Sequence, residues 1–147
     1  LQRYEVPAFA RPGHRAAHNL NYWACGDYMG IGAGARSKLS FHDRVVRQVR
    51  WRDPATYMAR ALQQQAVSNE TPVTAQQLPF EFMLNALRLV EGVPTALFEE
   101  RTGLSPVAFG GALQRAVAQG LLDAHPARLQ PTPRGLDFLS DLQALFL

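Results

Sequence analysis

Apolar residues recur at helical spacing through the second half of the chain, and most of these runs open at a proline and close at a glycine. Proline suits the first turn of a helix, and glycine suits the position just after its end. Between the last two runs, "LLDAHPARLQP" predicts two short strands around a turn at His125 and Pro126. Three helices, a hairpin and a final helix are typical of a winged-helix-like module. The predicted helices run from Pro79 to Gly92, from Pro94 to Gly103, from Pro106 to Gly120, and onward from Thr132 and Pro133.

The first half of the chain alternates apolar and polar positions, which is typical of strands. Residues 37–52, "SKLSFHDRVVRQVRWR", predict a hairpin with its turn at residues 42–44. Asp53 and Pro54 then predict the start of a helix, because a capping carboxylate precedes a proline at the first helical position. Residues 67–77 are polar and contain a proline, so they predict a linker and an internal boundary.

Residues 15–37, "RAAHNLNYWACGDYMGIGAGARS", mix bulky aromatic residues with alternate glycines and predict an irregular segment rather than a helix. The run "GIGAGA" fits the dinucleotide-binding pattern G-x-G-x-x-A. That pattern must lead into a helix, whereas the following "RSKLSF" alternates like a strand. Two interpretations of Gly30, Gly32 and Gly34 stay open. Either these glycines allow close packing and unusual torsion angles, or their backbone lines a ligand cavity.

His18 is the residue of this segment best suited to chemistry. A neutral imidazole offers a lone pair to iron or another metal, while its second nitrogen donates to an orienting partner such as Asn19 or Tyr22. The alternative is a structural histidine that is hydrogen-bonded to nearby backbone. Cys25 is the only cysteine, so the chain provides neither an internal disulfide nor the thiolates of a metal cluster.

Charge is unevenly distributed along the 147 residues, whose net charge is +3. Residues 1–60 hold ten Lys and Arg against four acidic residues, whereas residues 61–147 hold five against eight. The helix after Pro106 would be the recognition helix of a DNA-binding winged helix, yet its only charged side chain is Arg115. Because attraction to phosphates requires clustered basic residues, we expect no nucleic-acid partner.

The termini and the hydropathy of the chain predict its location. No apolar run approaches the roughly 20 residues of a membrane-spanning helix, and no charged and then apolar leader opens the chain. Together with the single cysteine, these features predict a cytoplasmic protein. The chain begins with Leu1 rather than methionine, which predicts a piece of a longer protein.

Four stretches carry a more specific signal: "YEVPAFARPGHRAAHNLNYWACGDYMGIGAGARS", "RDPATYM", "PFEFMLNALRLVEGVP" and the terminal "PTPRGLDFLSDLQALFL". Together they closely resemble the C-terminal part of the HemW family of radical-SAM haem chaperones, long labelled oxygen-independent coproporphyrinogen III oxidase-like. The resemblance implies an α+β fold. Residues 1–68 would be the strand and hairpin tail of a partial (β/α) barrel with a connecting helix. Residues 74–147 would be a mostly helical, winged-helix-like C-terminal domain.

The resemblance also implies a haem site. In this family the motif H-N-x-x-Y, matched by His18, Asn19 and Tyr22, is regarded as haem-binding, which makes His18 the expected ligand of the haem iron. Candidates to pack on the porphyrin or to meet its propionates are Tyr22, Trp23 and Tyr28, and Arg11, Arg15 and Arg36.

The family's cluster motif, C-x-x-x-C-x-x-C, holds a four-iron four-sulfur cluster and S-adenosylmethionine in the upstream barrel and is not matched in this chain. Gly30, Gly32 and Gly34 would border the cavity for S-adenosylmethionine. The implied function is a haem chaperone that passes haem to an acceptor protein, and the chain itself is not expected to be an enzyme. Two alternatives stay open: oxygen-independent coproporphyrinogen III oxidase activity in the parent protein, and a winged-helix nucleic-acid-binding module.

Overall fold

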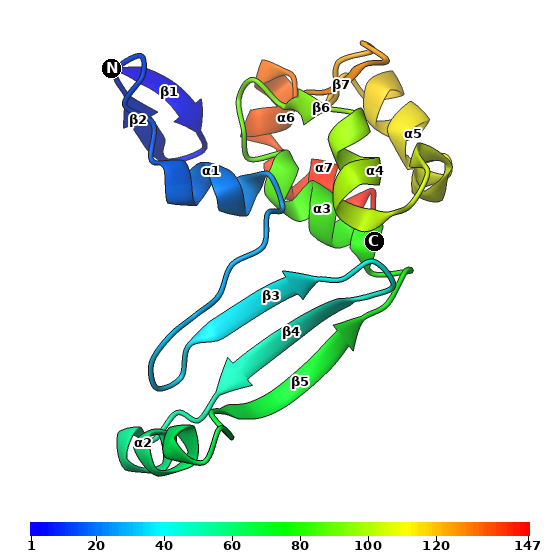
Figure 1. The fold of residues 1–147 in the computed structure, drawn as a ribbon. Coiled ribbons are helices and arrows are strands. Elements are labelled where there is room, and N and C mark those ends of the chain that lie inside the picture. The colour runs from blue at the N-terminus through cyan, green and yellow to red at the C-terminus, as the bar shows by residue number, and fades with distance from the viewer. The chain divides into compact units, whose positions relative to one another are not determined.

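The computed structural model describes residues 1–147 and divides them into two compact units (Figure 1). Unit 1 comprises Leu1–Gly26 together with Ala75–Leu147, and unit 2 comprises Asp27–Thr74. Both units contain helices and strands, and no sheet closes into a barrel, so the predicted mixed helix and sheet content is confirmed. The assignment of residues 1–68 to a barrel tail and of residues 74–147 to a separate domain stays a prediction.

Unit 1 consists of short helices and two small antiparallel sheets. In the first sheet β1 (Gln2–Glu5) pairs with β2 (Ala8–Ala10), and in the second β6 (Val93–Pro94) pairs with β7 (Arg128–Leu129). The helical elements are α1 (Ala17–Trp23), α3 (Leu78–Ala86), α4 (Ala96–Thr102), the 3-10 helix η1 (Pro106–Phe109), α5 (Ala112–Ala118), α6 (Pro133–Asp137) and α7 (Leu139–Ala144).

Four phenylalanines from different parts of the chain form the centre of the core of unit 1. Phe82 of α3 contacts Phe98 of α4, Phe98 contacts Phe109 of η1, and Phe109 contacts Phe146, with ring centroids 5.2, 4.1 and 5.6 Å apart. Each fully buried ring contributes about 1.5–3 kcal/mol of transfer free energy. The cluster therefore fixes α3, the helix that α1 contacts.

Two of the predicted helices are interrupted. The run predicted from Pro106 to Gly120 is η1 followed by α5, because Gly110 adopts a φ of 53° and ends the first piece. The last helix begins as predicted, with the Thr132 hydroxyl accepting from the backbone N–H of Gly135, but Phe138 divides it into α6 and α7.

The predicted hairpin around His125 is the largest departure in this half. Leu122 and Pro131 form only an isolated bridge, and β7 pairs with β6, which precedes α4 in the chain. The turn itself is present, since the Arg128 N–H donates to the carbonyl of His125 at 3.2 Å. The winged-helix description of this unit stays a prediction.

Unit 2 is a three-stranded antiparallel sheet with one helix (Figure 1). The predicted hairpin is confirmed as β3 (Arg36–Ser40) and β4 (Val45–Arg50), with Ser40 opposite Val45 across the turn. The predicted helix is also confirmed as α2 (Pro54–Leu62). Its cap is the Asp53 carboxylate, which accepts from the Thr56 N–H at 2.7 Å.

Two predictions from local composition are wrong. The predicted linker 67–77 contains β5 (Val67–Val73), which pairs with β4 as an edge strand. Five consecutive residues of β5 are exposed, so the strand lacks the alternation that would reveal it, and Pro72 is tolerated at an edge. The segment 15–37, predicted to be irregular throughout, begins with the helix α1.

Candidate functional site

The helix α1 brings the three residues of the H-N-x-x-Y motif together. His18 and Tyr22 are four residues apart, so they lie on one face of the helix. Both are exposed, Tyr22 to 44%, and Asn19 beside them is half-buried. The imidazole of His18 makes no hydrogen bond or ion pair, so the structural alternative for this histidine is not realised. Both ring nitrogens are therefore available to a ligand from solvent.

A hydrogen-bonded turn ends α1 directly after the motif. The Cys25 N–H donates to the carbonyl of Tyr22 at 3.0 Å, and the Gly26 N–H donates to the carbonyl of Asn21 at 2.8 Å. This is the Schellman pattern, in which one residue adopts the left-handed conformation that usually requires glycine. Cys25 occupies that position with a φ of 54°. Its side chain is 7% exposed and belongs to the core of unit 1, which offsets the strain.

A partly buried ion pair contacts the C-terminal end of α1. The Arg88 guanidinium donates from Nε to Oε1 of Glu5 at 2.7 Å, and its Nη2 is also 2.7 Å from that oxygen. Glu5 is 2% exposed, and a carboxylate this deeply buried requires a partner. The guanidinium also stacks on Trp23, the last residue of α1, with its Cζ 4.5 Å from the ring centroid.

A second ion pair holds the segment just before α1. Arg15 donates two hydrogen bonds to Glu91, at 2.8 and 2.6 Å, and its Cζ lies 5.6 Å from the ring centroid of Tyr4. These hydrogen bonds lower the pKa of the Glu91 carboxyl below its ordinary value, and the same pair raises the pKa of Arg15. Arg15 is thereby engaged within unit 1, while Arg11 is exposed.

The three glycines predicted to border a cavity lie in unit 2, so the two parts of the predicted site belong to different units. Their N–H groups are all satisfied within that unit: Gly30 donates to Ser37 Oγ, Gly32 to the Tyr57 hydroxyl and Gly34 to the carbonyl of Trp51. An added Cβ at Gly30 would collide with the carbonyl oxygen of Arg36, so close packing accounts for this glycine. Gly32 and Gly34 have φ of 107° and 72°.

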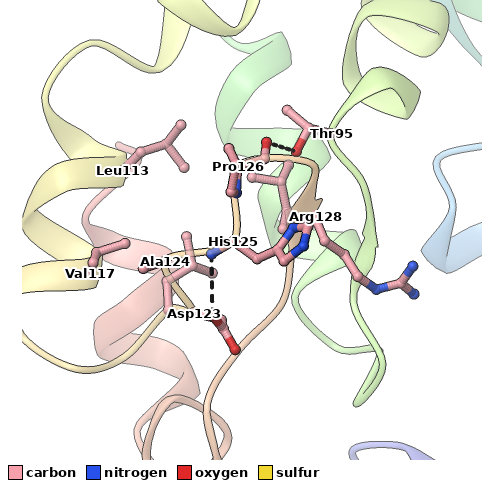
Figure 2. Close-up of a pocket in the computed structure, with 10 residues that line it drawn as sticks. Thr95, Leu113, Val117, Asp123, Ala124, His125, Pro126 and Arg128 are labelled. Carbon is pink, nitrogen blue, oxygen red and sulfur yellow. Dashed lines mark hydrogen bonds between the residues drawn. The ribbon is translucent and has the colours of Figure 1, made fainter.

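A small hollow lies between α5 and residues 122–129 (Figure 2). Leu113 and Val117 of α5 point toward the turn that carries Asp123 and His125. The hollow measures about 120 Å³, less than the roughly 300–1,000 Å³ of typical small-molecule pockets. It does not have room for a porphyrin.

Hydrogen bonds within the turn also make His125 unsuitable as an iron ligand. Its backbone N–H donates to Asp123 Oδ1 at 3.2 Å, and its Nδ1 accepts from the Ala127 N–H at 3.2 Å. A neutral imidazole that accepts at Nδ1 carries its proton on Nε2, so it presents a donor where iron needs a lone pair. His18, whose nitrogens are unengaged, fits the requirement better.

The chain does not fit an iron-sulfur cluster. The Sγ of Cys25 points at backbone carbonyls of the core, 3.9 Å from that of Glu81 and 3.7 Å from that of Phe82. No group of three or more His, Cys, Asp or Glu side chains is arranged to hold a metal ion. No helix has the length and apolar character needed to cross a membrane.

The aromatic and basic candidates for porphyrin contact differ in exposure and in the unit to which they belong. Trp23 has one face covered by Arg88, which leaves Tyr22 as the exposed aromatic residue of α1. Tyr28 and Arg36 lie in unit 2 with the glycines. The residues that hold α1, Glu5, Arg88 and Glu91, were not predicted from the sequence. Glu5 and Arg88 are 83 positions apart, and no periodic pattern links them.

Comparison with known proteins places this arrangement in a class. Residues 73–138 match the family model "HemN C-terminal domain". A solved structure titled "Coproporphyrinogen III oxidase (HemN) from Escherichia coli is a Radical SAM enzyme" aligns with 82% of this chain and 28% of its own, with a TM-score of 0.55 and 17% identity. At that identity the likeness shows the fold alone. The fold is that of the C-terminal part of HemN-like proteins.

Two curated relatives are more similar in sequence to this chain than the solved structure is. "Heme chaperone HemW" of Escherichia coli (strain K12) is 41% identical over 99% of this chain, and the protein of that name from Haemophilus influenzae is 38% identical over 99%. The chain therefore resembles HemW proteins over nearly its whole length, and its residues 73–138 match the HemN C-terminal domain. It spans 38% and 37% of the length of these two relatives.

Proposed function

We propose that this chain contributes the haem-binding part of a haem chaperone, with His18 as a ligand of the haem iron. The observation that carries the proposal is the exposed, unengaged imidazole of His18 beside Tyr22, on a helix held by two ion pairs. Histidine is a common axial ligand of haem iron. The name "Heme chaperone HemW", borne by the two relatives, supports the same function.

Two other exposed residues of unit 1 have side chains that suit a haem cargo. Tyr22 offers an exposed aromatic face to the porphyrin, and Arg11 offers an exposed guanidinium to a propionate through a charge-assisted hydrogen bond. A ligand held on an exposed helix face stays accessible to a second protein. This accessibility supports transfer of the haem to an acceptor protein, whose identity the chain does not specify.

The parent protein would supply the radical-SAM chemistry. We place the four-iron four-sulfur cluster and S-adenosylmethionine outside this chain, because Cys25 is its only thiol and faces the core. The role of Gly30, Gly32 and Gly34 as a wall of the S-adenosylmethionine cavity stays a prediction, as does the cytoplasmic location. The internal hydrogen bonds of the three glycine N–H groups favour the packing interpretation.

A haem titration followed through the Soret band tests the proposal. We expect the chain to bind an equimolar amount of haem with the spectrum of a histidine-ligated iron. We expect His18→Ala to lose that spectrum and at least about tenfold in affinity, which corresponds to about 1.4 kcal/mol. His14→Ala is the matched control, because His14 is also exposed and lies four residues earlier, outside the helix. Equal binding by the chain and its His18 variant, or no binding by either, would contradict the proposal.

A further inference from the structure

The helix that carries His18 has little stability of its own. It is seven residues long, its cap Ala16 makes no side-chain hydrogen bond, its first turn has no acidic residue and its last turn has no basic residue. None of its residues is fully buried. An isolated helix of this length is marginal in water. The position of α1, and of the imidazole on it, must therefore come from contacts with other elements.

α1 contacts α3, and two polar contacts near its ends come from the segment that follows α3, residues 88–91. Arg88 stacks on Trp23 at the C-terminal end of α1. Glu91 pairs with Arg15, which lies two residues before the start of α1. The same segment joins β1, since Leu89 forms a bridge with Glu5 and the Val90 N–H donates to the carbonyl of Tyr4 at 3.1 Å. Contacts with this segment therefore hold α1 near both of its ends, while His18 between them stays exposed to solvent.

Arg88 is the central residue of this arrangement. Its guanidinium is held by the buried carboxylate of Glu5, so its orientation over the indole is determined by an ion pair rather than by solvent. The Nε1 of Trp23 is buried and has no hydrogen-bond partner, so the indole is not positioned by a hydrogen bond of its own. The stacked guanidinium is the polar contact that positions it, because an arginine plane over an aromatic face gives a defined geometry.

We propose that Arg88 is a positioning residue for haem ligation: through its stack on Trp23 and its pair with Glu5 it holds α1 so that the His18 imidazole can bind iron. This inference rests on the proposed function. The Arg88 guanidinium contacts Glu5 and Trp23, and it forms no hydrogen bond or ion pair with His18. Its effect resembles that of groups around a metal site that orient a ligand without binding the metal, whose loss typically costs roughly 10–100-fold in metal affinity.

The test uses the full 147-residue chain and two readouts. Arg88→Gln alone leaves the Glu5 carboxylate buried without its partner and endangers folding. The informative variant is therefore the double change Glu5→Gln with Arg88→Gln, which keeps a hydrogen-bonding pair, removes both charges and removes the stacked guanidinium. Arg101→Gln, which changes an exposed arginine of α4, is the matched control. Amide hydrogen exchange over residues 17–23 without haem reports on the helix, and the haem titration reports on the ligand.

We expect the double variant to keep its melting temperature within a few degrees, to exchange faster over residues 17–23, and to lose roughly tenfold in haem affinity together with part of the histidine-ligated spectrum. Arg88→Lys keeps the charge but not the planar stack. Its amide exchange over residues 17–23 and its haem affinity should therefore lie between those of the unaltered chain and the double variant. Unchanged exchange over residues 17–23 would overturn the positioning role. Faster exchange with an unaltered haem spectrum and affinity would overturn it too. Absence of haem binding by the unaltered chain would overturn the proposed function, and the positioning role with it, while the exchange readout would still show whether Arg88 holds the helix.

Discussion

Close backbone approach makes Gly135 one of the most constrained residues of unit 1. It lies in α6, and an added Cβ would collide with the carbonyl oxygen of Leu121, a backbone atom that cannot turn aside. That carbonyl also accepts from the Thr132 N–H at 3.0 Å, so moving it would disturb the cap of α6. We expect Gly135→Ala to lower the free energy of unfolding by about 2–4 kcal/mol, measured by urea denaturation.

Gly103 provides the comparison for this prediction. It ends α4 with a φ of 70°, but nothing lies within 4 Å of an added Cβ. Gly103→Ala therefore introduces only the strain of a left-handed alanine, about 1–2 kcal/mol. A Gly135 variant that is no less stable than the Gly103 variant would show that α6 moves away from Leu121 at little cost.

Individual residues were predictable from the sequence where their role is local. The H-N-x-x-Y spacing identified His18 and Tyr22, and the structure places them on one exposed helix face. Arg88 and Glu5 were not predictable, because their importance comes from meeting each other across 83 positions. A glutamate in a short strand and an arginine at a helix end carry no mark of a buried pair in the sequence.

The ion pair between Arg15 and Glu91 predicts how the stability of the chain depends on pH. The pKa of Glu91 is lower in the folded chain than its ordinary value, because the carboxylate accepts two hydrogen bonds from Arg15. Stabilisation by this pair is therefore present above the ordinary glutamate pKa and is lost as the pH falls through the lowered value. We expect the unfolding midpoint in urea to decrease as the pH falls below about 4.5.

Variants separate this pair from the other carboxylates of the chain. Glu91→Gln should be less stable than the unaltered chain at neutral pH and should show a flatter decline in acid. Glu99→Gln, which changes an exposed carboxylate of α4 without an ion pair, should leave the decline unchanged. Parallel pH profiles for all three proteins would show that the pair of Arg15 and Glu91 contributes nothing measurable. Because the side chain of Glu91 is 60% exposed and that of Arg15 is 33% exposed, high salt should weaken the effect.

Elements with local signals were predicted correctly, and elements that depend on distant partners were not. The hairpin of β3 and β4 and the start of α2 follow from alternation and from the dipeptide Asp53–Pro54. β5 was missed because an exposed edge strand has no apolar face to reveal it. The break after η1 was signalled by Gly110 and Gly111, but helical spacing of the surrounding apolar residues concealed it.

Charge divides between the two units in a way that bears on the function of the whole molecule. Unit 2 holds seven Lys and Arg against four acidic residues, so it carries the entire net charge of +3, and unit 1 is neutral. The one basic residue of the predicted recognition helix, Arg115, donates to the carbonyl of Leu145 at 3.1 Å. A neutral unit whose candidate contact residue is engaged in its own fold gives nucleic-acid binding no support.

The two units also differ in how much core they possess, which predicts unequal local stability. All members of the core cluster, from Cys25 to Phe146, belong to unit 1, whereas α2 has no buried residue and β5 exposes five of its seven. Segments with few buried apolar contacts open at a lower free energy than the core. We therefore expect amides of β4 and β5 to exchange with solvent faster than amides of α3 and α4 in hydrogen-exchange mass spectrometry.

A core variant tests whether the difference reflects separate cooperativity. Phe98→Ala removes a ring that is 0% exposed and should cost about 3–5 kcal/mol. If unit 2 opens independently, this variant should speed exchange in α3 and α4 while leaving β4 and β5 unchanged. Equal protection of both units in the unaltered chain, or a loss of protection in all four elements at once, would instead mean that the sheet of unit 2 opens only together with the phenylalanine core.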